Sequence, residues 1–188
     1  MIDAGAEGIV APYVESTGQV KAMIGAMKYR PLKGERLQEV LENPGWIEPE
    51  LKVYLDRYND GNLCIINVES TPAVERLDEL LAVPGLDGVF IGPHDLSVSM
   101  GVPEMYDHPE FEDAVRQIIR TCRAKNVAVG IHLSGSPQRQ VKWLNEGINM
   151  VIHSSDLAIF SQALARDIHE IKQSRNDADL TSSEGIVI

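Results

Sequence analysis

The 188-residue sequence has few basic residues, few aromatics and only two cysteines, and each shortage excludes a class of protein. Because 17 Lys and Arg face 28 Asp and Glu, the net charge is -11, and the chain lacks the clustered positive charge that nucleic acids and anionic membranes attract. No apolar run approaches the ~20 residues of a membrane span. The first residues, 1–7, carry acids and no basic stretch, unlike a signal peptide. We therefore expect a cytoplasmic protein that binds neither nucleic acid nor membrane.

The cysteines, Cys64 and Cys122, are too few for a disulfide framework and have no metal-ligand spacing. Both lie in apolar segments, so we expect reduced core residues, as in the cytosol. A hydrophobic content of 44% over this length suits one domain with a substantial core. We expect a single domain over residues 1–174 and a C-terminal tail over 175–188.

Short apolar runs alternate with amphipathic stretches, which predicts an α/β fold with parallel strands buried on both faces. The predicted strands cover residues 8–13, 63–66, 88–91, 128–133 and 149–153. Helices are predicted after the Ser16–Gln19 capping box and over residues 50–58, 72–83, 111–122, 138–146 and 157–171. Five strands alone do not distinguish a doubly wound sheet from a (β/α)8 barrel.

Residues 30–61 interrupt this alternation with prolines and glycines. Only Glu50–Tyr58 has a helical pattern, so we predict an excursion over the mouth of a barrel.

Two acids follow buried strands that are joined by a single helix. Glu69 comes after the strand at 63–66, with Thr71 and Pro72 as the predicted N-cap and first position of the helix, and Asp95 comes after the strand at 88–91. Parallel strands deliver such acids to the same edge of a sheet, where two carboxylates suit a hard cation. The alternative, that each acid is an N-cap or turn residue, stays open at this point.

The residues around these acids resemble the HpcH/HpaI family of metal-dependent pyruvate aldolases, which includes 2,4-dihydroxyhept-2-enedioate and 2-dehydro-3-deoxyglucarate aldolases. The matching stretches are Val68–Ser70 and Leu77–Ser97, followed by Met100 and Gly101, and weaker likeness covers nearly the whole chain. The resemblance implies a (β/α)8 TIM barrel of the phosphoenolpyruvate/pyruvate type. This chain would carry about the last five strand–helix units, since it aligns from the end of the third helix and three strands would precede it.

The resemblance also implies a carbon–carbon lyase that forms or cleaves a 4-hydroxy-2-oxoacid from pyruvate and an aldehyde. Its cofactor would be Mg²⁺ or Mn²⁺, with Co²⁺ or Zn²⁺ as alternatives, held by Glu69 and Asp95. Relatives assemble as trimers or hexamers and partly exchange the last helix, so a homo-oligomer is expected. The alternative is a catalytically silent truncated barrel that acts only in association or weak metal binding, because the family's catalytic histidine and pyruvate-binding arginine have no match here.

Further site residues are carried over from the family pattern. Asn67 stands where the family commonly has a glutamine that contacts substrate, and it shares a strand face with Glu69. The turn Gly92, Pro93, His94 would offer backbone donors to the substrate carboxylate, with no role for the imidazole. Asp3 matches an aspartate that supports the catalytic histidine in the family. The alternative, that Asp3 is only an acid at the end of a truncated helix, fits the sequence equally well.

Other strand-end residues have no counterpart in the family signature. His132 and His153 end the last two predicted strands and are either catalytic or satisfied structural histidines. Ser134, Gly135 and Ser136 are candidates to line the mouth. An imine-forming aldolase needs a lysine at a strand end, whereas helices or loops are predicted for all seven lysines: Lys21, Lys28, Lys33, Lys52, Lys125, Lys142 and Lys172.

Overall fold

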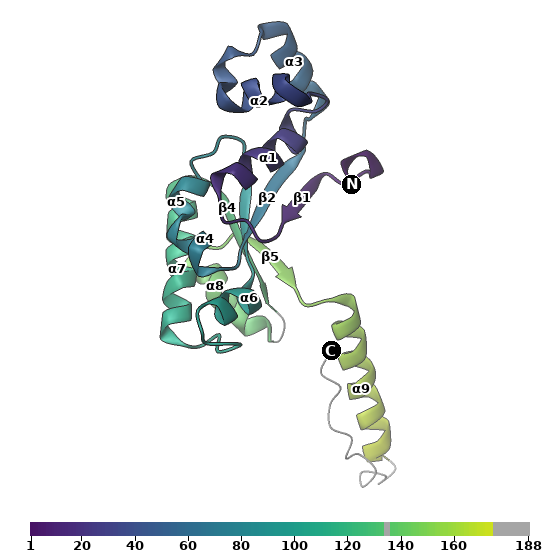
Figure 1. Cartoon of the computed structure of the whole chain (residues 1–188). Coiled ribbons are helices and arrows are strands. Elements are labelled where there is room, and N and C mark those ends of the chain that lie inside the picture. Colours follow the sequence, from purple (N-terminus) through teal and green to yellow (C-terminus); the bar gives the residue numbers. More distant parts are fainter. Residues whose placement is uncertain (134–135, 175–188) are drawn as a thin grey trace. The chain divides into compact units, whose positions relative to one another are not determined.

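The computed structural model describes residues 1–133 and 136–174 (Figure 1). The chain divides into two compact units, one over Met1–Ile152 and one beginning at His153, and each is described by itself. The single domain over residues 1–174 stays a prediction, and the predicted tail at 175–188 lies outside the described residues.

Five parallel strands form a curled half-barrel in which spatial order follows chain order. They are β1 (Gly8–Ala11), β2 (Leu63–Val68), β3 (Gly88–Ile91), β4 (Ala128–Leu133) and β5 (Met150–His153). A doubly wound sheet reverses its strand order at a switch point, and this sheet does not. The strand order therefore decides between the two architectures that the strand count left open, in favour of the barrel type.

Helices cover the outer face of the strands and enclose the core with them (Figure 1). They include α1 (Thr17–Lys28), α7 (Pro109–Ala124) and α8 (Pro137–Glu146). The apolar stripe predicted for α7 is confirmed, since its members are all buried: Phe111, Val115, Ile118, Ile119 and Cys122. Cys64 and Cys122 are free and buried, as expected of core residues, and burial raises the pKa of each thiol to about 12.

The helix predicted over residues 72–83 is wrong in detail, because the structure has two short helices, α4 (Thr71–Glu75) and α5 (Leu77–Leu80). The chain leaves helical geometry at Arg76, which caps the first helix and starts the second. The N-cap is Ser70 instead of Thr71. Ser70 is extended and its Oγ accepts a hydrogen bond from the Ala73 N–H, so the helix begins one residue earlier than predicted.

The excursion over residues 30–61 differs from its prediction in content and in place. It contains α2 (Gly34–Glu42), a 3-10 turn η2 (Pro44–Trp46) and α3 (Pro49–Tyr58), and α2 was not expected. Two leucines of α2, Leu37 and Leu41, approach α1 at Gly25. Because the excursion follows α1 and precedes β2, it lies at the amino ends of the strands (Figure 1). The prediction that it covers the mouth is wrong.

Three further elements complete the described chain: η1 (Ile2–Ala4), α6 (Pro93–Ser99) and α9 (Asp156–Ser174). Residues 100–108 connect α6 to α7. In the second unit, the described residues of α9 form a 19-residue helix with no buried side chain. None of the helices in the described part of the chain is long and apolar enough to cross a membrane.

Candidate functional site

A cavity of about 390 Å³ lies at the carboxyl ends of the strands, within the first unit. It brings together Asn67, Glu69, Gly92, Pro93, His94 and Asp95, all of which were singled out in the sequence. The other lining residues are Val10, Phe90, Ile91, Tyr106, His132, Leu133 and Ile152.

Glu69 is the most buried acid of the cavity, with 6% of its surface exposed. Its Oε1 accepts a hydrogen bond from the backbone N–H of Tyr13 (2.7 Å), and its Oε2 accepts one from the Asn67 amide (3.0 Å). Among the described residues, no lysine or arginine pairs with it. Neutral donors thus fix the carboxylate without cancelling its charge, and a buried charge of this kind favours a cationic ligand.

Two of these contacts differ from what the sequence suggested. The Asn67 side-chain amide was expected to reach substrate, whereas here it donates to Glu69. Tyr13 was not singled out at all. It contributes through its backbone N–H from a left-handed conformation (φ 55°), and a backbone contact of this kind leaves no signal in residue type.

Gly92 is required by the close approach of Glu69. A Cβ on this residue would lie 2.7 Å from Glu69 Oε2 and 2.8 Å from its Cβ, inside the normal contact distance. The Gly92 N–H continues the strand ladder to the carbonyl of Val68 (3.2 Å), and Pro93 has no N–H. The first free donors of α6 are therefore the N–H groups of His94 and Asp95, which find no backbone or capping acceptor among the described residues.

Asp95 lies in the first turn of α6, with its side chain exposed to the cavity and without an ion pair to a described lysine or arginine. The neighbouring His94 directs its Nδ1 to Glu104 Oε1 at 3.5 Å, and its side chain is 62% exposed. This placement agrees with a site role for the backbone of His94 and not for its ring.

The donor set suits a hard divalent cation. Glu69, which follows β2, and Asp95, in the helix that follows the neighbouring strand β3, offer carboxylate oxygens, the ligand type that Mg²⁺ and Mn²⁺ prefer. Within residues 1–133 and 136–174, no group of three or more His, Cys, Asp or Glu could hold a metal. As ligands, Glu69 and Asp95 stay a prediction; Mg²⁺ held by two carboxylates usually completes its shell with water and substrate oxygens.

The remaining candidates are dispersed. Asp3 lies on η1, its side chain is 86% exposed, and it pairs with Arg30 outside the cavity. His132 lines the cavity and His153 does not. Ser134 and Gly135 lie outside the described residues, and Ser136 is the N-cap of α8. The seven lysines lie in helices or beside their ends, as predicted.

Tyr106 is a cavity residue that the sequence reasoning missed. It lies in the segment 100–108, and its ring packs edge-on against Phe111 with centroids 5.7 Å apart. Desolvation raises the pKa of its hydroxyl, and the charges of Glu104 and Asp95 raise it further, against an opposing effect of Arg139. The only signal in the sequence was an aromatic ring in a loop at the carboxyl edge of the sheet, where barrel sites gather.

Comparison with known proteins gives three findings. Residues 1–163 match the family model HpcH/HpaI aldolase/citrate lyase. A 2-keto-3-deoxy-L-rhamnonate aldolase of Escherichia coli O17:K52:H18 is 34% identical over 97% of this chain and 68% of its own length. Among solved structures, an HpcH/HpaI aldolase from Desulfitobacterium hafniense DCB-2 superposes with a TM-score of 0.75 at 25% identity.

The solved aldolase is matched over 91% of this chain and 66% of its own chain. The citrate synthase SbnG, also at TM-score 0.75, is 23% identical over 93% of this chain and 66% of that one, which is a likeness of fold. The present chain thus spans about two-thirds of the length of these proteins.

Proposed function

The chain belongs to the HpcH/HpaI aldolase/citrate lyase family, whose members are carbon–carbon lyases, and on that premise we propose that it acts as a metal-dependent aldolase. The reaction is the joining of pyruvate to an aldehyde and the cleavage of the resulting 4-hydroxy-2-oxoacid. The aldolase names of its relatives support the reaction class.

The observation that best supports metal dependence is the environment of the Glu69 carboxylate. Its carboxylate is buried in the cavity that Asp95 also lines, is oriented by neutral donors and has no lysine or arginine partner among the described residues. Glu69 and Asp95 would hold a divalent cation, which would supply Lewis-acid polarisation of the 2-oxo group of pyruvate and so acidify its methyl protons.

The chain's own groups bind and orient the substrate. The N–H groups of His94 and Asp95 begin α6 and receive the pyruvate carboxylate, since donors at a helix start suit an anion. The Asn67 amide donates to one carboxylate oxygen of Glu69, and the Tyr13 N–H donates to the other. These two hydrogen bonds keep the acid in place when the substrate enters. The apolar side chains of Val10, Phe90 and Ile152 limit water around the reacting carbons.

The rival mechanism forms an imine between pyruvate and a lysine, and chemistry distinguishes the two. Lys142 and the other lysines occupy helices or helix ends, away from the strand ends that carry Glu69. We expect EDTA to abolish activity and borohydride with pyruvate to leave it intact. Inactivation by borohydride without sensitivity to EDTA would establish the imine route.

The metal site is tested by calorimetry of Mg²⁺ or Mn²⁺ binding with and without oxalate, a pyruvate analogue. In the parent we expect oxalate to tighten metal binding about tenfold or more, and metal to tighten oxalate binding by the same factor, because linkage is reciprocal. Glu69→Gln and Asp95→Asn keep the side-chain shape and remove the charge, so each should abolish this coupling.

The matched control is Asp78→Asn, an exposed acid of α5 that pairs with Lys125 at 3.1 Å. It should leave the coupling unchanged. Unchanged coupling in Asp95→Asn, or its absence from the parent, would remove the basis for the proposal.

Two further properties belong to the proposal. The buried, free thiols of Cys64 and Cys122 fit a reducing compartment, and we place the protein in the cytoplasm. We also propose that it acts as a homo-oligomer, a trimer or hexamer.

A further inference from the structure

The segment 100–108 folds back onto α6 and carries Tyr106 to the cavity. Buried Ser97 makes the connection: its Oγ donates to the carbonyl of His94 (2.7 Å) and accepts from the N–H of Glu104 (3.0 Å). The N–H of Val102 also donates to the Ser97 carbonyl (2.9 Å). The segment is therefore anchored to the helix that begins with the cavity residues.

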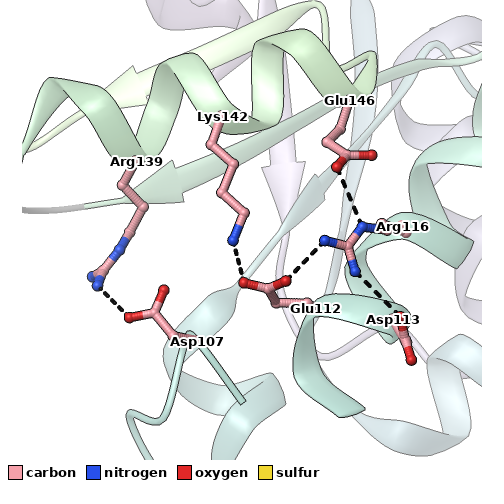
Figure 2. Close-up of polar contacts among 7 residues, drawn as sticks. All are labelled: Asp107, Glu112, Asp113, Arg116, Arg139, Lys142 and Glu146. Carbon is pink, nitrogen blue, oxygen red and sulfur yellow. Dashed lines mark hydrogen bonds and ion pairs between the residues drawn. The ribbon is translucent and has the colours of Figure 1, made fainter. Parts of the chain in front are cut away.

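A second anchor comes from α8. Arg139 forms an ion pair with Asp107 at 3.1 Å, and its guanidinium lies over the Tyr106 ring, 5.7 Å from the centroid (Figure 2 shows the ion pair). Phe111 of α7 contacts the ring edge-on. A phenol ring held by a cation and by a second ring has little rotamer freedom left to lose when a ligand binds.

The hydroxyl of Tyr106 is available for a ligand. Within residues 1–133 and 136–174, no group hydrogen-bonds to it. Its pKa is raised, so it stays protonated at neutral pH and acts as a donor. The carboxylates and the free N–H groups of the cavity come from the ends of β2 and β3, whereas Tyr106 comes from a separate segment and adds a neutral donor to another wall.

We propose that Tyr106 is a further substrate-contacting residue that selects hydroxylated aldehydes, and that Arg139 is the residue that positions it. The proposal rests on the proposed aldolase function. With pyruvate bound in the cavity, the Tyr106 hydroxyl donates a hydrogen bond to a hydroxyl on the carbon chain of the aldehyde. The substrate class is thus small polyhydroxy or hydroxy aldehydes in preference to alkyl aldehydes.

The test uses two aldehydes of nearly equal size, glycolaldehyde and propanal, which differ by a hydroxyl in place of a methyl group. Tyr106→Phe removes only the phenolic oxygen. We expect kcat/KM for glycolaldehyde to fall about tenfold, the usual value of one hydrogen bond, and that for propanal to change less than twofold. The coupling of Mg²⁺ and oxalate, measured by calorimetry, should be unchanged because the metal ligands are untouched.

Arg139→Gln tests the positioning role, with Lys142→Gln as its matched control. Both cations lie on the same face of α8 and pair with acids that precede or begin α7, Arg139 with Asp107 and Lys142 with Glu112 (Figure 2). Lys142 lies over the Trp143 ring instead of the Tyr106 ring. We expect Arg139→Gln to lose part of the glycolaldehyde preference, mainly through KM. Lys142→Gln should lower the melting temperature at least as much and keep the preference.

Four results would overturn the inference or a part of it. An equal loss of kcat/KM with both aldehydes in Tyr106→Phe would place the hydroxyl at the reacting carbonyl instead. No loss of kcat/KM with either aldehyde would show that the hydroxyl does not contact the substrate. Equal effects of Arg139→Gln and Lys142→Gln on the preference would reduce Arg139 to a structural role. If the parent turns over neither aldehyde and lacks metal–oxalate coupling, the proposed function fails first and this inference fails with it.

Discussion

At the scale of single residues, the position of Glu69 depends most directly on Gly92. A Cβ at this position would overlap Glu69 Oε2 at 2.7 Å, so Gly92→Ala must push the carboxylate from its place or shift the turn. We expect a loss of about 1–3 kcal/mol in unfolding free energy, as for other overpacked sites, and weaker Mg²⁺ binding. Denaturant unfolding and calorimetry measure both.

The control is Gly45→Ala in η2, where a Cβ meets nothing within 4 Å. Its unfolding free energy and metal affinity should match those of the parent. Equal metal affinity in Gly92→Ala would show that Glu69 does not depend on the glycine.

The sequence pointed to some of these residues and not to others. Glu69 and Asp95 were singled out because each acid follows a buried strand, and the family resemblance then favoured a metal site over an N-cap or turn role. The N–H of Tyr13 was not, because every residue except proline carries one. Tyr106 was equally hidden: its contact with the cavity depends on Ser97 and Arg139, which are distant in sequence or unremarkable in pattern.

At the scale of secondary structure, α7 and α8 are joined by a network of charges around a buried ring. Glu112 accepts from Lys142 and from Arg116 (2.8 Å), and Arg116 also pairs with Asp113 and Glu146 (Figure 2). Arg116 and Lys142 both lie over the Trp143 ring. The network holds two neighbouring helices of the barrel together at the end that carries segment 100–108.

Glu112 gives this network a defined pH dependence. The hydrogen bond from Lys142 is the largest cause that lowers its pKa from 4.5, followed by that from Arg116. A lowered folded-state pKa means that the stabilisation is complete above 4.5 and is lost as the pH falls through the folded-state pKa. We expect Glu112→Gln to cost on the order of 1 kcal/mol at pH 7 and to make stability less sensitive to acid below pH 4.5.

Thermal unfolding of parent and variant between pH 3 and pH 7 measures this effect, with Glu110→Gln as the control. Glu110 shares the first turn of α7, and so the helix dipole, but no ion pair of the described residues includes it. A variant curve parallel to that of the parent across this range would show that Glu112 is not the titrating group.

Elements were predicted well where one pattern of apolar residues runs uninterrupted, as in α7 and β4. In both, the larger apolar residues of the sequence are the ones that the structure buries. The break at Arg76 was not predicted, because the apolar residues keep their helical spacing across it although the backbone leaves helical geometry there. The helix α2 was not predicted because the nearby prolines and glycines indicated a loop. Its place at the amino ends of the strands follows from the parallel topology, because a segment between a helix and the next parallel strand lies at the start of that strand. The sequence already predicted this topology, so the wrong placement was avoidable.

At the scale of the whole molecule, the surface of α9 predicts self-association. Its apolar residues are all exposed in the described chain, although a helix with such a stripe normally buries it: Leu157, Phe160, Leu164, Ile168 and Ile171. We expect light scattering to give a multiple of 20.7 kDa for the parent. Phe160→Glu with Leu164→Glu should reduce that mass, because the stripe then carries charge.

Gln162→Glu adds a charge to the opposite face of α9 and should leave the mass unchanged. A parent that scatters as a single chain would contradict the predicted oligomer.

The pairing of β2 with β3 has a consequence for how such an enzyme can diversify. Val68 and Ile91, the residues just before Glu69 and Gly92, are direct partners in the ladder, so the strand spacing of about 4.8 Å sets the distance between the ends that carry the two acids. Segment 100–108 has its own supports in Ser97 and Arg139. Under the proposed function, mutations in that segment would change substrate preference while the ladder keeps the two acids in place, a division that would let new activities arise without passing through inactive intermediates.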